Sequence, residues 1–196
     1  MGVNKTYAIL DKAFAFIGTS PVSLNDAKAH LNMLFETDGS YEFDDDDDYI
    51  GQLIEECTAA LESYTGTSIR ERTVVVIFEY HRGKFTLPYG PVSTPAGAIQ
   101  VLDKDGVAID NCYIRGLANK YFDGPCIPYG QIQYSAGYGE VFPNCPDDLL
   151  RAIKEEVAYR YNNRGAEGRQ YAAEEPGVSE GARKLAAPYR RGVWLL

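Results

Sequence analysis

The stretch from Asp44 to Val76 constrains the fold of this chain more than any other. Its apolar residues recur every three or four positions, which places them along one face of an α-helix; they are Ile50, Leu53, Ile54, Cys57, Leu61 and Tyr64. Aspartates precede this stripe, where the unpaired N–H groups and the helix dipole favour negative charge. Gly66 follows it and suits a left-handed helix cap. We therefore predict a helix over about residues 46–65, followed by a strand.

A shorter helix is predicted before it, over about residues 24–35. Ser23 suits its N-cap, and Asp26 three residues later gives a loose capping box, in which each of the two residues binds the main chain of the other. The apolar residues that follow keep a helical spacing; they are Leu24, Ala27, Leu31 and Leu34. Residues 36–45 form a polar, acidic loop between the two helices.

A third helix is predicted over about residues 146–164. Pro146 suits the first turn, and either Asn144 or Cys145 would cap it. Gly165 lies just beyond the last turn, where helices often stop. The buried stripe of this helix is expected to consist of Leu150, Ile153, Val157 and Tyr161.

Between the second and third helices the residue types change to those of strands. Residues 73–80 are mostly β-branched or aromatic, and Asp105-Gly106 is a strong signal for a hairpin. The strands are expected at residues 73–80, 84–87, 98–102, 107–114, 121–127 and 131–135. Prolines interrupt the region and favour short, twisted or edge strands over one long sheet; they are Pro88, Pro91, Pro95, Pro125 and Pro128.

This order of elements predicts an α+β fold, a small helical bundle with an inserted antiparallel β region and a C-terminal docking tail. The expected parts are an N-terminal extension (1–20), the helical core (21–68 and 144–165), the β-rich insertion (69–143), and a linker with a C-terminal arm (166–196). The start of that last part is polar and rich in glycine, as flexible linkers are. A short helix is expected near residues 178–187.

Composition excludes several classes of protein. No run of about 18 apolar residues exists, so no membrane span is predicted. The N-terminus lacks the pattern of a signal peptide, and synthesis in a cytoplasm is expected. The net charge of −9 argues against general binding of nucleic acid. None of the four cysteines forms a C-x-x-C pair, so free thiols are expected, while a disulfide among Cys112, Cys126 and Cys145 stays open.

The negative charge is concentrated in residues 36–62, which contain no Lys or Arg. Within this stretch, Asp44, Asp46, Asp48 and Glu55 match positions 1, 3, 5 and 12 of a calcium loop. The sixth position is Tyr49, however, where that loop needs glycine for its sharp turn. We therefore predict no metal site and interpret the aspartates as a solvated helix start.

The C-terminus combines basic and large apolar residues after the flexible linker. Arg, Tyr and Trp are common at the energetic centres of protein interfaces, so this arm is predicted to dock on another protein. Its candidate residues are Arg183, Lys184, Leu185, Tyr189, Arg190, Arg191 and Trp194. The alternative is that the arm folds back on its own domain.

No constellation in the sequence indicates catalysis. His30 and His81 belong to no Ser/His/Asp or Cys/His motif, and no nucleophile elbow, Walker loop or dinucleotide fingerprint is present. We predict no enzyme and no cofactor; a hydrolase using Asp or Glu pairs is a remote rival, since no motif places such a pair. The 15 tyrosines, several of them in the β region, suit either a protein interface or a small core. A module that holds a glycan or peptide on the β region is thus a further alternative.

The ordered set of motifs resembles the head–tail connector (adaptor, or head-completion) proteins of long-tailed bacteriophages and related gene-transfer particles. The matching segments are VSLNDAKAHLNM (22–33), DDDYIGQLIEECTAALESYTGTSI (46–69), FTLPYGPV (85–92), VLDKDG (101–106), IQYSAGYGEVFPNCPDDLLRAIKEEVAYRYNNR (132–164) and LAAPYRR (185–191). Residues 1–20 and 36–45 depart from the family pattern.

The resemblance implies a structural protein of the virion, without enzymatic activity. Such proteins form a homo-oligomeric ring, usually of twelve subunits, beneath the portal protein at the capsid vertex. The ring extends the DNA channel, through which DNA passes without sequence-specific binding, and carries the stopper or tail. A tail-side stopper or terminator protein is the nearest alternative.

Two hypotheses about this chain's own residues follow from that implied role. Its acidic segment would border the channel, where like charge keeps DNA from adhering; it consists of Asp44, Asp45, Asp46, Asp47 and Asp48. Its C-terminal arm, residues 178–196, would anchor the subunit to the portal.

Overall fold

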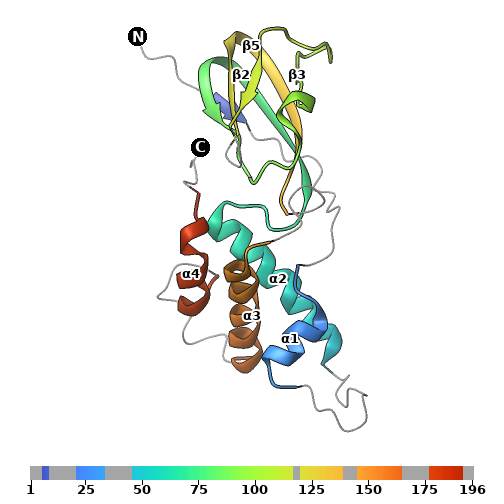
Figure 1. The fold of residues 1–196 in the computed structure, drawn as a ribbon, viewed down its shortest axis with the longest axis vertical. Helices are drawn as coiled ribbons and strands as arrows, with labels where there is room; N and C mark the ends of the chain where they lie inside the picture. Colours follow the sequence, from blue (N-terminus) through green and yellow to red (C-terminus); the bar gives the residue numbers. More distant parts are fainter. Residues whose placement is uncertain are drawn as a thin grey trace. The chain divides into compact units, whose positions relative to one another are not determined.

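Figure 1 shows the computed structural model, which describes residues 6–8, 21–33, 46–116, 120–138, 145–164 and 177–191. The described residues form four α-helices and an antiparallel sheet, so the chain is an α+β protein. It divides into two compact units. The helical unit contains Ser20–Thr65 and Cys145–Gly192, and the β unit contains Met1–Thr19, Gly66–Asn144 and Val193–Leu196.

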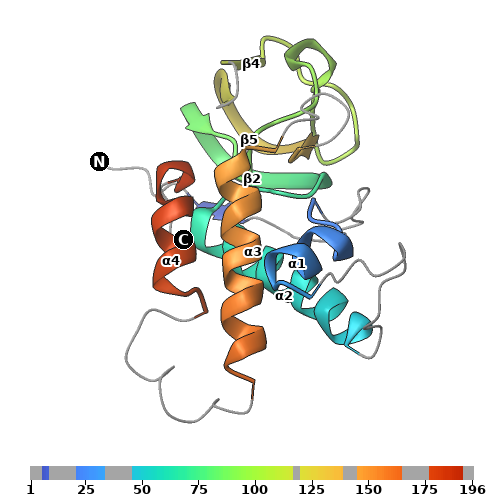
Figure 2. The same cartoon turned by 60° about the horizontal axis from the view of Figure 1, so that its bottom comes forward.

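The helical unit is built around its third helix (Figure 2). Helix α3 (Asp147–Asn162) packs against α1 (Leu24–His30), α2 (Asp47–Thr65) and α4 (Glu180–Ala186). A 3-10 turn, Ala187–Tyr189, follows α4. The predicted stripe of α2 is confirmed, because all its members are buried except Tyr64, which is half-buried. The stripe of α3 differs from the prediction, since Leu149, Ala152 and Glu156 are buried while Leu150 and Tyr161 are only partly so.

The helix ends agree with the sequence predictions at two points and differ at two. Ser23 and Asp26 form the predicted capping box, and Gly66 is left-handed with φ 63°. Ser179, for which no cap was predicted, caps α4. Helix α1 is shorter than predicted because Asn32, with φ 56°, turns the chain after His30; Leu34 and Phe35 lie outside the described residues. The N-cap of α3 is Pro146, whose side chain makes no capping hydrogen bond, so the predicted cap at Asn144 or Cys145 is wrong.

Among the described residues, two strands of the β unit are longer and two are shorter than the sequence predicted. Its strands are β1 (Thr6–Ala8), β2 (Arg72–Thr86), β3 (Val101–Leu102), β4 (Tyr113–Arg115) and β5 (Tyr121–Ala136), in the order β1-β2-β5-β3, with β4 also on β5. The predicted strands 73–80 and 84–87 are one strand, as are 121–127 and 131–135. The register begins with Arg72 opposite Ala136, and a further bridge joins Arg70 to Tyr138. The chain therefore enters and leaves the β2–β5 ladder side by side.

The predicted hairpin forms its turn and a short stretch of pairing beside it. The side chain of Asp103 accepts hydrogen bonds from the N–H groups of Asp105 and Val107, and Gly106 has φ 79°. The flanks also pair next to the turn: the N–H of Asp103 donates to the carbonyl of Val107 and that of Ile109 to the carbonyl of Val101, both at 2.8 Å. Beyond these residues, β3 and β4 pair with β5, so the predicted hairpin is confirmed only close to its turn.

Two of the prolines lie within β5, where one of its sides is open. Strand β4 pairs with residues 121–123 of β5, and β3 pairs with 131–132. Between these two stretches, the structure describes no partner for β5 on that side, and Pro125 and Pro128 fall there. A proline removes one N–H donor, which a strand tolerates where no neighbour needs it. The prolines thus mark a local edge within a long strand, not its end.

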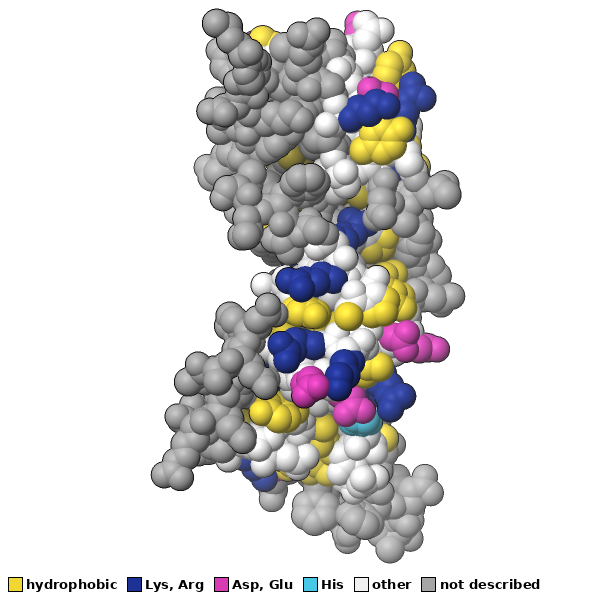
Figure 3. Space-filling view, turned by 90° about the vertical axis from the view of Figure 1, so that its left-hand side faces the viewer, with side chains coloured by type: hydrophobic (Ala, Val, Ile, Leu, Met, Phe, Trp, Pro, Cys, Tyr) yellow, Lys and Arg dark blue, Asp and Glu magenta, His cyan; other side chains and the backbone are white. Residues whose placement is uncertain are grey.

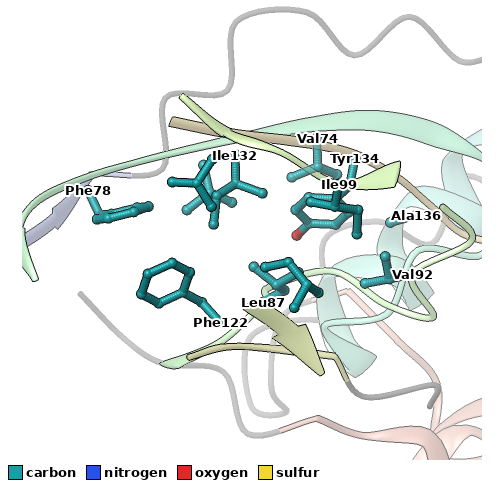
Figure 4. Close-up of a cluster of buried hydrophobic side chains, with 12 residues drawn as sticks. Val74, Phe78, Leu87, Val92, Ile99, Phe122, Ile132, Tyr134 and Ala136 are labelled. Atoms are coloured by element: carbon teal, nitrogen blue, oxygen red, sulfur yellow. The ribbon is translucent and has the colours of Figure 1, made fainter. Parts of the chain in front are cut away.

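The β2–β5 ladder folds over on itself around two phenylalanines (Figure 4). Phe78 pairs with Gly130, and Phe122 pairs with Phe85, seven residues further along β2. A flat strand would separate positions 78 and 85 by roughly 23 Å, yet the rings of Phe78 and Phe122 lie 5.4 Å apart. The register shift between His81 and Gly83 lies in the stretch that must bend.

The interior of the folded ladder is the core of the β unit. Its buried side chains are Val74, Val76, Phe78, Leu87, Val92, Ile99, Val101, Ile114, Phe122, Ile132, Tyr134 and Ala136. The hydroxyl of buried Tyr134 donates to the carbonyl of Pro88. Lys120 Nζ donates to the carbonyls of Val92 (2.7 Å) and Thr94 (3.0 Å), and burial lowers its pKa. These polar contacts attach the proline-containing loop 88–94 to the sheet.

Candidate assembly surfaces

The described part of the acidic segment is held by cations of the same helical unit. Asp46 precedes α2, and its carboxylate accepts hydrogen bonds from the hydroxyl of Tyr161 and from Arg164 Nη1, the latter at 3.0 Å. Both donors lie at the C-terminal end of α3. The hydrogen bond from Tyr161, together with that from Arg164, keeps the pKa of Asp46 below its usual value. The same hydrogen bond raises the pKa of Tyr161.

Asp47 is paired in a similar way with the first helix. Its Oδ1 lies 2.5 Å from Nζ of Lys28, whose side chain is 3% exposed. Asp48 is exposed, and Asp44 and Asp45 lie outside the described residues. The sequence did not predict that α1 and α3 would each supply a cation to this acidic helix start. The pairing lowers the net negative charge that the segment presents.

No calcium loop is present at this helix start, because residues 47–55 already belong to α2. Within the ranges that the structure describes, no group of three or more His, Cys, Asp or Glu side chains could hold a metal ion. His30 lies on α1 with its Nε2 3.9 Å from a carboxylate oxygen of Glu155, while the side chain of His81 is not described.

The described thiols are free. Cys57, Cys112 and Cys145 form no disulfide, and the side chain of Cys126 is outside the described set. Burial raises the pKa of the Cys57 thiol to about 12, and that of Cys145 likewise to about 12. Such thiols are poor nucleophiles, because the thiolate is the reactive form.

The C-terminal arm is packed on the helical unit as far as it is described. Ala182 and Ala186 are buried, whereas Lys184 is exposed and pairs with Glu180 at 2.7 Å. The guanidinium of Arg190 lies 5.1 Å from the ring centre of Tyr64 on α2. The N–H of Arg191 donates to the carbonyl of Thr65 at 2.7 Å.

The other candidate residues of the arm are partly covered, and Trp194 lies outside the described residues. Arg183, Leu185 and Tyr189 are each half-buried. Burial, followed by the negative charge of Asp148, raises the pKa of Tyr189. Figure 3 shows Lys and Arg side chains gathered on the helical unit, with acidic ones between them. The arm thus presents cations while its small residues pack inwards.

A buried ion pair on α3 holds the start of the arm, and the sequence analysis did not identify it. Glu156, which is 1% exposed, accepts from Arg160 Nε at 2.8 Å and from the N–H of Ser179 at 2.7 Å. Arg160 Nη2 donates to the carbonyl of Gly177 at 2.6 Å. The available signal was an acid four residues before an arginine, adjacent to Val157 of the predicted stripe. We call Glu156 and Arg160 the arm clamp.

The outer face of the β unit carries an ordered patch of aromatic and charged side chains. Asp123 on β5 pairs with Tyr113 on β4 and Lys84 on β2, and Tyr121 pairs with Arg115 on β4. The two cations lie over tyrosine rings, Arg115 over Tyr113 at 5.1 Å and Lys84 over Tyr121 at 5.5 Å. Both also approach Asp123, at 3.5 and 3.7 Å. Tyr113 remains 50% exposed. We call these five residues the β-face patch.

None of the helices in the described ranges is both long and apolar enough to cross a bilayer.

Comparison with solved structures shows which known chains have a similar fold. No protein-family model and no curated protein matches the chain. Among solved structures, it is similar to a chain in the neck of an empty gene transfer agent (GTA) particle with C6 symmetry, with TM-score 0.65 and 18% identity. It is also similar to a chain of the native GTA virion (TM-score 0.62, 20% identity) and to one in the native neck with C12 symmetry (0.60, 19%). Each match covers 91% of this chain and 95% of the other.

These matches confirm the resemblance to head–tail connector proteins at the level of the fold. They extend over both units, since only a small fraction of either chain is left uncovered. At this level of sequence identity, the role of an individual residue in the neck chains cannot be assigned to a residue of this chain.

Proposed function

We propose that this chain is a structural protein in the neck of a phage-like particle. The single observation that carries the proposal is the likeness of its fold to neck chains over nearly the full length of both. An isolated helical bundle or β module would match such chains only in part. The order of the sequence motifs supports the same function independently.

In the finer form of the proposal, the chain forms a homo-oligomeric ring, with twelve as the expected number of copies. The ring joins the portal at the capsid vertex to the stopper or tail and extends the DNA channel. The C6 and C12 symmetries of the similar neck structures support a ring. A closed ring needs a head-to-tail contact between different faces of neighbouring copies.

In this proposal the acidic segment borders the DNA channel and the arm binds the portal, and the contacts of each indicate which of its residues would do so. Asp46 and Asp47 are paired within the helical unit, so among the described aspartates repulsion of DNA would rest chiefly on exposed Asp48. The arm would bind the portal through its basic and aromatic residues, of which Lys184 and Arg190 are exposed.

The experiment mixes the purified chain with the portal ring of the same particle and images the product by electron microscopy. A ring of this chain on the portal is the expected result. Binding only to tail proteins would favour the tail-side stopper alternative, and no binding to either would overturn the proposal.

The arm is tested by substitution instead of deletion. Val178, Ala182 and Ala186 are buried, so removal of residues 178–196 would uncover part of the helical unit. The double variant R190A/W194A should weaken portal binding, with K104A, an exposed lysine of the β unit, as the control. If both variants bind the portal equally well, the arm is not part of the interface with the portal.

A binding module for a glycan or peptide is the second candidate, and the β-face patch is what favours it. Exposed tyrosine rings beside cations are suited to such ligands. Ligand binding that is lost in Y113A, by a chain that assembles with no neck protein, would support this candidate over the first.

A further inference from the structure

The arm clamp contacts the start of the C-terminal arm through main-chain atoms. The carboxylate of Glu156 accepts from the N–H of Ser179, and the guanidinium of Arg160 donates to the carbonyl of Gly177. Arg160 Nε also donates to Glu156, so the two side chains and the Gly177–Ser179 segment form one closed hydrogen-bonded set. Its geometry fixes both the position and the direction of the chain where α4 begins.

Both side chains of the clamp are largely buried, so loss of any of its hydrogen bonds would leave a buried polar atom without a partner. Glu156 is 1% exposed and the Arg160 side chain 19% exposed. A buried carboxylate is tolerated only when its oxygens are hydrogen-bonded, and both oxygens of Glu156 are. Val178, between the two clamped residues, is itself buried. The arm is therefore attached to α3 at its first residues, in addition to the packing of α4 on α3.

Arg160 also connects the clamp to the second helix. Its Nη1 lies 3.9 Å from a carboxylate oxygen of Glu56 on α2. Because α2, α3 and the arm meet at one guanidinium, the position of the arm is set by the packed helices of its unit.

We propose that Glu156 and Arg160 are positioning residues for the C-terminal arm, whose docking on the partner depends on the place where they fix it. This inference rests on the proposed function, since it takes the arm as a docking element. A binding element that is fixed in advance loses less conformational freedom on association. Releasing the base of the arm should therefore weaken binding even though no residue in contact with the partner has changed.

The test compares E156Q and R160Q with matched controls on the same helix, all in the full chain. Glu155 and Arg151 lie on α3 and pair with each other at 3.7 Å on the exposed side, so E155Q and R151Q change the same charges outside the clamp. Hydrogen exchange is measured on the amides of 179–186 and, separately, on those of α2. Binding is measured to the portal ring of the same particle.

Release of the arm should raise the exchange rate of its amides about tenfold or more in E156Q and R160Q, and weaken portal binding by a similar factor. The α2 amides should keep their protection, which a general loss of stability would not allow. The double variant should be no worse than either single variant, because the two residues act as one unit.

Two results would overturn the inference. One is unchanged exchange of the arm in both variants; the other is a released arm with portal binding equal to that of the E155Q control. A wild-type chain that does not bind the portal would instead count against the proposed function, and the exchange measurement would still decide whether the clamp holds the arm.

Discussion

Replacement of Gly130 by alanine should destabilise the β unit, because its Cβ would occupy the space of a buried ring. A Cβ built at this position overlaps the far edge of Phe78. That ring is fully buried and lies against Phe122 at 5.4 Å, so it has little room to withdraw. Overpacking of this kind typically costs about 1–3 kcal/mol. For a unit of this size, each kcal/mol corresponds to a shift of roughly 4–8 °C in Tm.

The same substitution at Gly51 is a control with the opposite expected sign. Gly51 lies within α2, and a Cβ there meets no heavy atom within 4 Å. Alanine is favoured over glycine in a helix by about 0.5–1 kcal/mol, so G51A should stabilise the helical unit. The assay is thermal and urea unfolding of both variants, followed by signals from each unit separately.

A second variant tests the physical cause. Leucine at position 78 is shorter than phenylalanine and would leave room for the new methyl group. In the double variant F78L/G130A the two substitutions should therefore cost less than the sum of their separate effects. Additive effects, or a G130A variant as stable as the wild type, would refute the explanation that Gly130 is needed because the ring of Phe78 occupies the space of a Cβ.

Three further predictions concern single groups. D46N should lower the free energy of unfolding at pH 7 but not at about pH 2. Folding lowers the pKa of Asp46, so its stabilising contribution is present above the pKa of the unfolded chain and is lost as pH falls through the pKa of the folded chain. Unfolding of the wild type and the variant, measured over a series of acidic pH values, checks this. Cys57 should resist maleimide at pH 8 until the helical unit unfolds, because its thiol is buried with a pKa of about 12; rapid labelling in the native protein, detected by mass spectrometry, would contradict this. Y134F should cost about 1 kcal/mol in urea unfolding, since the carbonyl of Pro88 loses its donor, and an unchanged midpoint would argue against that hydrogen bond.

The helices could be predicted from the sequence because their signals are local. The three-to-four spacing in α2, the Ser23–Asp26 box and the left-handed Gly66 each depend on a few neighbouring residues. Strand lengths in the β unit depend on distant partners instead. Pro125 and Pro128 looked like strand breakers, but the structure describes no neighbour on the side where β5 carries them.

The candidate surfaces could be predicted only in outline. Composition identified the acidic segment and the basic arm, but not the cations Lys28 and Arg164 that pair with the aspartates, since these come from other helices. The arm clamp was missed because an i,i+4 Glu–Arg pair usually lies on an exposed helix face. Here the Gly177–Ser179 segment is hydrogen-bonded to both side chains, a contact that no local pattern predicts.

The ladder that starts with Arg72 opposite Ala136 also bears on the order of folding. Helices α2 and α3 are separated in the chain by the whole β unit, and bringing them together across about 80 unstructured residues would cost about 4 kcal/mol of chain entropy. Once β2 and β5 have paired, Arg70 and Tyr138 are held together, and only a few residues separate each from its helix. The β2–β5 ladder, all of which precedes α3 in the chain, thereby replaces a long loop with a short one. A substitution that disrupts the ladder, although outside the helical unit, should slow the assembly of the helical unit.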